Sequence, residues 1–219
     1  TATKGSIATS ATGVTMGVID MANKETFDAN SDIHSTVASK FTYPGVDPKT
    51  PFDTDDFGNP TTELQDTNAL LLSTVETAGS IYYKNSTSFA IEADKYYLLQ
   101  YSICTNIESD EDNKANKGAW VTVSGGVSYQ DTVINTNGKW ETHYLYIESN
   151  KNSSKTIDIY LWLGNGPDVV NSVPNKYIVK GSALFDNIIC KEVTKDKDGE
   201  TEFNHTTFTN ASLKFSLSF

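Results

Sequence analysis

The amino-acid sequence predicts an all-β fold, a two-sheet antiparallel β-sandwich with long loops. Short runs of β-branched and aromatic residues recur along the chain, and clusters of Gly, Asn, Asp and Ser separate them at the spacing expected of a sandwich. Helical periodicity is nearly absent, and the best helix candidate is the short piece from Asn30 to Ala38. A chain of 219 residues is long enough for one substantial core.

The predicted strands are bounded by turn residues, and several of them alternate apolar with polar positions, as a strand with one buried face requires. In chain order they are Gly13 to Ile19, Ala69 to Ser73, Ser80 to Tyr83, Thr87 to Ile91, Tyr96 to Thr105, Ala119 to Gly125, Val127 to Ile134, Trp140 to Ser149, Thr156 to Leu163, Ala183 to Val193 and Ser212 to Phe219. Two long segments, Phe41 to Asn68 and Gly164 to Lys180, lack strand signals and are predicted to be loops that are either functional or packed ornaments.

The C-terminal segment differs from the rest of the chain. We take residues 1–193 as one domain and residues 194–219 as a charged linker followed by a terminal strand, in which apolar residues alternate strictly from Leu213 to Phe219. An alternating strand needs a partner. It closes the sheet of its own domain, begins a following module, or acts as a donor strand that completes another subunit.

Composition excludes several classes of partner. The net charge is −11 and the chain contains no arginine, so little is available to neutralise phosphate groups, and neither nucleic acid nor an anionic membrane surface is expected to bind. No apolar run approaches the length of a membrane span. Because the chain begins at Thr1, we interpret it as a processed protein or an excised piece of a larger one.

The two cysteines, Cys104 and Cys190, both lie in predicted strands. Neighbouring strands would allow a single bridge between them, and the favoured alternative is two separate small apolar residues.

Two strands carry tryptophan on the face that their aliphatic residues do not use. In Ala119 to Val123 and in Ile157 to Leu163 the aliphatic residues hold the odd positions, so Trp120, Tyr160 and Trp162 point the other way. Flat aromatic rings on a sheet suit sugar rings, whose C–H faces stack on them while polar neighbours bind the hydroxyls.

Polar candidates share the outward phase of their strands: Gln100, Thr122 and Asp158. They converge with the aromatic residues on one groove if the strand from Tyr96 lies in the same sheet as the two tryptophan strands. The alternative is that the long loops or the terminal strand cover these rings. Trp140 follows an Asn-Gly turn signal and is predicted to be structural.

Catalysis has little support. The three histidines are scattered without metal-ligand spacing, and a glycoside hydrolase would need two carboxylates at a fixed separation. The acidic stretches at residues 53–58 and 108–112 are predicted to be solvated turns, because the first fails the calcium-loop pattern.

Seven short pieces, in this order and spacing, resemble the carbohydrate-binding-module-like, galactose-binding-like jelly-roll domains that repeat in large surface or secreted proteins of Gram-positive bacteria. The pieces are Asn68 to Leu72, Ser86 to Ile91, Ala93 to Leu99, Gly118 to Val121, Asn135 to Trp140, Leu161 to Gly164 and Gly181 to Asn187. The resemblance implies a jelly roll without catalytic activity, located outside the cell or at its surface, that binds a polysaccharide or other glycan on one concave sheet.

The resemblance also implies a structural calcium ion held in part by Asp186, although the usual partner motif near the N-terminus is missing. Our leading hypothesis is a non-catalytic carbohydrate-binding module in which Trp120 and Trp162 stack on the sugar and Gln100 and Asp158 donate or accept hydrogen bonds, with Tyr160 beside them. The rival hypothesis is a structural repeat, adhesin or filament subunit that contacts neighbouring modules or subunits through residues 203–219.

Overall fold

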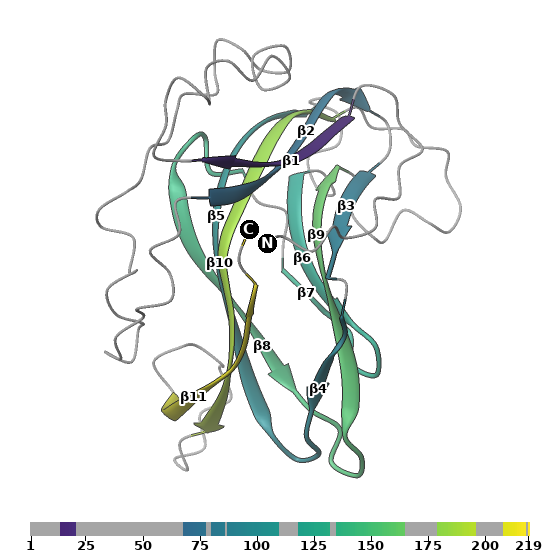
Figure 1. Cartoon of the computed structure of the whole chain (residues 1–219), viewed down its shortest axis with the longest axis vertical. Coiled ribbons are helices and arrows are strands. Elements are labelled where there is room, and N and C mark those ends of the chain that lie inside the picture. The colour runs from purple at the N-terminus through teal and green to yellow at the C-terminus, as the bar shows by residue number, and fades with distance from the viewer. Residues whose placement is uncertain are drawn as a thin grey trace.

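The computed structural model describes residues 14–20, 68–77, 80–85, 87–109, 118–131, 135–164, 179–195, 208–217 and 219, and these form two antiparallel β-sheets. Figure 1 shows the sheets as two layers. The described residues contain strands and turns but no helix, so the predicted all-β sandwich is confirmed. The helix candidate at residues 30–38, the loop residues 41–67 and 165–178 and the acidic stretches at 53–58 and 110–112 lie outside the described residues. Glu108 and Ser109, which were predicted to begin the second acidic turn, instead end the strand Tyr96–Ser109.

Eleven strands make up the described fold. The six-stranded sheet contains β1 (Val14–Asp20), β2 (Asn68–Thr77), β5 (Tyr96–Ser109), β8 (Trp140–Glu148), β10 (Val179–Lys195) and β11 (Phe208–Leu217). The five-stranded sheet contains β3 (Ser80–Lys84), β4 (Phe89–Ile91), β6 (Gly118–Ser124), β7 (Tyr129–Gln130) and β9 (Lys155–Gly164).

The order of the strands is that of a jelly roll. One sheet runs β1-β2-β10-β5-β8 and the other β3-β9-β6-β7, so β10 lies between β2 and β5 while β9 lies between β3 and β6. The chain therefore crosses repeatedly between the sheets, and each late strand enters between two early ones, as the paired Greek keys of a jelly roll require. The predicted jelly roll follows from this connectivity alone.

The main core lies between the two sheets, and strand alternation explains its composition. On β9 the odd-numbered residues from Ile157 to Leu163 are buried and face inward, and on β6 Ala119, Val121 and Val123 do the same. The even-numbered residues of both strands lie on the opposite face, because successive side chains of a strand alternate between faces. The outward phase predicted for the two tryptophan strands is therefore present in the structure.

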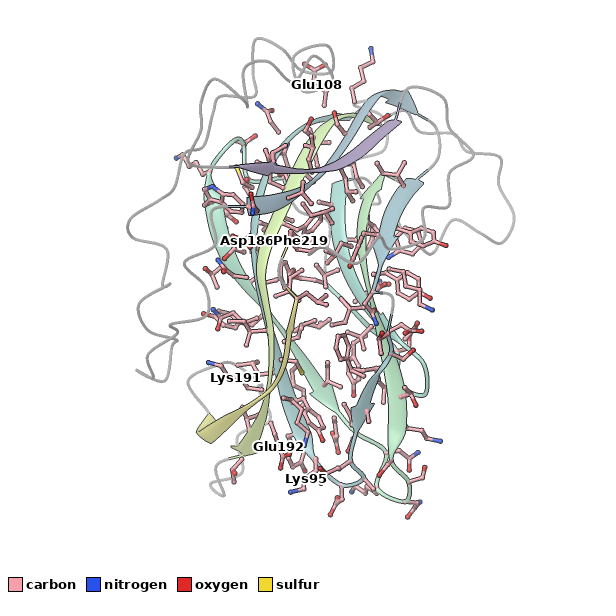
Figure 2. The ribbon with its side chains drawn as sticks, viewed as in Figure 1. Lys95, Glu108, Asp186, Lys191, Glu192 and Phe219 are labelled. Carbon is pink, nitrogen blue, oxygen red and sulfur yellow. The ribbon has the colours of Figure 1, made fainter. Side chains whose placement is uncertain are left out.

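Strand β11 pairs with β10 of its own chain. β10 is long enough to hold two neighbours on one edge: its first part pairs with β2, and the part from Ile188 to Lys195 pairs with β11. Figure 2 shows Phe219 between the two sheets, where its ring meets Tyr83 edge to face at a centroid distance of 5.6 Å. Within this chain, the terminal strand thus closes the sheet to which it belongs.

An ion cluster of four residues holds β11 to its neighbours. The Lys214 ammonium lies 3.2 Å from Glu192 of β10 and 2.9 Å from Glu92, which follows β4. Glu192 also pairs with Lys95 at 2.8 Å, and Figure 2 shows these last two at the end of the sandwich away from β1. The cluster joins three parts of the chain.

The two cysteines are separate. β5 and β10 are neighbours, yet Cys104 lies opposite Leu184 while Cys190 lies opposite Leu99. Cys190 belongs to the main core, and Cys104 packs in a second cluster with Leu71 and Leu184 on the outer face of the same sheet. Both thiols are free and buried, and burial raises the pKa of each. The alternative of two small apolar residues is the one the structure adopts.

Candidate binding face

The outer face of the five-stranded sheet carries a row of aromatic side chains that runs across three strands. Tyr82 of β3 pairs in register with Trp162 of β9, which pairs with Trp120 of β6. Neighbouring strands lie about 4.8 Å apart, so the three side chains stand next to one another. Tyr160 occupies the next outward position on β9. The structure thus brings together the three aromatic residues that the sequence predicted and adds Tyr82 to them.

Three of these rings form a contact cluster. Trp162 lies at centroid distances of 4.4 Å from Tyr82 and 5.8 Å from Tyr160, the latter pair nearly parallel at 20°. Tyr82 and Tyr160 are 5.4 Å apart. All three side chains are only half-buried. We call Tyr82, Tyr160 and Trp162 the aromatic platform. Such offset and tilted arrangements are the favourable ones for aromatic pairs, so the platform is held in place without a ligand.

Sequence reasoning missed Tyr82, although the signal for it is present. Ile81 and Tyr83 are both buried in the main core. The phase of Ile81 therefore places the residue between them on the outer face. Two adjacent tyrosines hid this phase, because either could have been the inward one.

The two tryptophans of the face differ in exposure and in bonding. The indole N–H of Trp162 donates to the hydroxyl of Thr122 at 2.9 Å. Trp120 is only 4% exposed, and in the described part of the chain its indole N–H has no hydrogen-bond partner. Of the two alternatives for the outward rings, open or covered, Trp162 is half-buried and Trp120 is buried.

An ion pair borders the aromatic platform. The Lys84 ammonium lies 2.9 Å from Oδ2 of Asp158 and 5.7 Å from the centre of the Tyr160 ring, while the Ser88 hydroxyl donates to Oδ1 at 2.6 Å. Burial alone would raise the pKa of Asp158, but the hydrogen bonds from Ser88 and Lys84 outweigh it and hold the pKa below its usual value. Asp158 is therefore an ionised and oriented acceptor next to the rings.

Gln100 does not belong to this face. The prediction joined it to the aromatic residues on the condition that its strand shares their sheet, but β5 lies in the six-stranded sheet and β6 and β9 in the other. Gln100 is buried between Ile189 and Tyr144 in register. Its alternation phase was read correctly, since Leu99 and Tyr101 on either side face the main core. The condition that the three strands share one sheet is not met. Period-two alternation could not have shown this, because it carries no information about which sheet a strand joins.

Asp186 lies on β10 in the six-stranded sheet, as Figure 2 shows. It is nearly buried, and its Oδ1 accepts from the backbone N–H of Asn187 at 2.7 Å. Calcium prefers six to eight oxygen ligands with several carboxylates. Among the residues with described positions, no three His, Cys, Asp or Glu side chains gather into a group that could hold a metal ion. These residues alone do not supply a calcium site, and calcium binding at Asp186 stays a prediction.

Trp140 is half-buried and packs on the second cluster beside Cys104, on the outer face of the six-stranded sheet. It is a packing residue, as predicted, but it does not face the main core.

A second polar cluster joins the two sheets at their β7 and β8 edges. Both ring nitrogens of His143 on β8 face carboxylates, Nδ1 at 3.5 Å from Asp131 and Nε2 at 3.0 Å from Glu141. The Tyr101 hydroxyl also donates to Asp131, and its ring stacks on the imidazole. The hydrogen bond with Asp131 is the main reason that the pKa of His143 is raised. The cluster therefore favours the doubly protonated, charged imidazole.

Comparison with known proteins leaves the chain without a family. No family model matches it, and no curated protein matches it. Among solved structures, a CBM4 carbohydrate-binding module is 8% identical with a TM-score of 0.37, over 59% of this chain and 73% of that one. A cyclase from Fischerella sp. TAU is 11% identical with a TM-score of 0.34, over 64% and 71%.

The CBM22-1-GH10 modules of endo-1,4-beta-D-xylanase 10B from Clostridium thermocellum, complexed with xylohexaose, are 9% identical with a TM-score of 0.30, and the chain spans 24% of their length. At these values the similarities assign no function, and the fold rests on the strand order itself. In the described part of the chain, no helix is long and apolar enough to cross a membrane.

Proposed function

We propose that this protein is a non-catalytic module that binds carbohydrate on the outer face of its five-stranded sheet. The observation that carries the proposal is the aromatic platform of Tyr82, Tyr160 and Trp162. Its rings are half-buried and packed within 4.4–5.8 Å of one another. Half-buried rings on an outward sheet face offer flat apolar surface on which a sugar ring can stack.

Polar groups beside the platform support the same ligand class. Asp158 is ionised and held by Lys84 and Ser88, so its remaining lone pairs can accept from sugar hydroxyls. Thr122 already accepts from Trp162 and retains a hydroxyl proton that it can donate. A few oriented polar groups next to an apolar surface are the usual composition of a small-molecule site.

We place the module outside the cell or at its surface, as one repeat of a larger protein of Gram-positive type. The acidic, arginine-free composition and the sequence resemblance support this setting. The rival function is a structural or adhesin subunit that assembles through its terminal strand. It ranks second because β11 pairs with β10 of its own chain and so occupies that edge of β10.

Affinity electrophoresis and isothermal titration test the proposal. The panel contains soluble xylan, mixed-linkage glucan, mannan and galactan, followed by hexasaccharides of whichever polysaccharide retards the protein. Trp162→Ala removes the central ring of the platform, and we expect it to weaken binding at least 10-fold, because stacking and the Thr122 contact are lost together.

The matched control is Tyr144→Ala. Tyr144 is also a half-buried aromatic residue on an outer face, but it lies on β8 in the other sheet. We expect this variant to bind as the parent does. Absence of binding to every member of the panel, or equal affinity of Trp162→Ala and parent, would exclude the proposed function.

A further inference from the structure

The indole N–H of Trp120 is a buried donor that none of the described residues satisfies. Trp120 and Trp162 are paired across β6 and β9, have the same side chain and lie on the same face. The N–H of Trp162 donates to Thr122 at 2.9 Å, whereas that of Trp120 has no acceptor among the residues with described positions. The Trp120 side chain is only 4% exposed, so bulk solvent reaches little of it.

A buried donor without an acceptor is unfavourable, because its hydrogen bond to water is lost on folding and not replaced. A phenylalanine at position 120 would supply apolar ring surface without this cost. The presence of tryptophan is explained if an acceptor arrives from outside the chain. The place where it arrives is also defined, since Trp120 is the direct cross-strand neighbour of the central platform residue Trp162.

We propose that the N–H of Trp120 donates a hydrogen bond to an oxygen of the bound glycan, in a closed subsite at the β6 end of the aromatic platform. This inference rests on the proposed function and changes the role of Trp120 from a stacking surface to a directional donor. A sugar hydroxyl or ring oxygen is the acceptor, because the platform next to it holds the sugar by its apolar face.

The test distinguishes the contribution of the Trp120 indole N–H to binding from that of its aromatic ring. Trp120→benzothienylalanine replaces the indole nitrogen by sulfur at nearly constant shape, and Trp120→Phe is the genetically encoded counterpart. The probe is the hexasaccharide of the polysaccharide that binds the parent, measured by isothermal titration. We expect each variant to bind about 3- to 10-fold more weakly, the equivalent of one neutral hydrogen bond. Circular dichroism verifies that both are folded.

A second measurement reads the donor directly. The chain has three tryptophans, so a ¹⁵N-labelled sample gives three indole N–H signals, which single Trp→Phe variants assign. Addition of the hexasaccharide should move the Trp120 signal downfield. Trp140, which packs on the opposite sheet, provides the control signal and the control variant Trp140→Phe, whose affinity should equal that of the parent.

The outcomes distinguish this inference from the function on which it rests. If the parent binds a glycan but the benzothienylalanine variant binds equally well and the Trp120 signal does not move, the subsite is overturned and the proposed function stands. If the parent binds none of the panel, both are overturned.

Discussion

Replacement of Phe219 by alanine tests whether the terminal strand is part of this fold. Phe219 is 6% exposed, belongs to the main core and meets Tyr83 edge to face at 5.6 Å. A phenylalanine buries roughly 150–200 Å² of surface, which at about 25 cal/mol per Å² corresponds to about 4 kcal/mol. Alanine retains part of this contact, while the lost aromatic pair adds about 1 kcal/mol.

We therefore expect Phe219→Ala to lower the free energy of unfolding by about 3–4 kcal/mol, within the range of core Phe→Ala changes. For a chain of 219 residues this corresponds to a Tm about 6–16 °C lower. Thermal melts followed by circular dichroism and urea titrations measure both quantities. The control is Val18→Ala on β1, since Val18 is 44% exposed and its loss should change stability by less than about 0.5 kcal/mol.

A Tm for Phe219→Ala within about 2 °C of the parent would refute the reasoning, because the residue that anchors the end of the chain after β11 would then contribute nothing to the core. Size-exclusion chromatography with light scattering adds a second criterion. If β11 pairs within its own chain, the parent should not dimerise through this strand. A dimer that dissociates in Phe219→Ala would instead favour exchange of the strand between copies.

Two further predictions concern backbone strain and pH. Gly181 has φ +142°, and a Cβ there would overlap the carbonyl oxygen of Asn106, so Gly181→Ala should lower the free energy of unfolding by about 3 kcal/mol in urea titrations. The control is Gly17→Ala, whose added Cβ meets nothing within 4 Å and whose stability should stay close to that of the parent. Equal urea midpoints for the two variants would contradict this prediction. The pKa of His143 is raised by Asp131 and by a second carboxylate on its own strand, so its contribution to stability is complete below about pH 6.5 and is lost as the pH rises through the folded-state pKa. The Tm difference between the parent and His143→Asn should therefore shrink from pH 5.5 to pH 9, and a constant difference would count against the cluster.

The phase of each strand could be predicted from the sequence, because alternation along a strand depends on local pattern alone. Ile157 and Leu161 turn inward and Tyr160 and Trp162 outward, as their order in the chain indicates. The paired tyrosines at 82 and 83 were the ambiguous case, since both residue types suit either face.

Partnership between strands could not be predicted in the same way. Gln100 has the predicted phase but lies in the other sheet, because the position of β5 beside β10 is set by pairs that range from Ser109↔Val179, 70 residues apart in the chain, to Tyr96↔Val193, 97 residues apart. The pairing of β11 with β10 was one of three alternatives for the same reason. Long-range pairing is a property of the assembled sheets, and a single strand carries no record of its neighbours.

The sequence by itself determined that this is an all-β chain with aromatic residues on the outward phase of two strands, since residue type and period-two alternation are local properties. Only the tertiary structure decided that Tyr82 joins Tyr160 and Trp162, that Gln100 does not, and that Trp120 is covered with its N–H unsatisfied. Exposure and hydrogen bonding depend on what lies opposite a side chain in space, and that is settled when distant segments of the chain pack together.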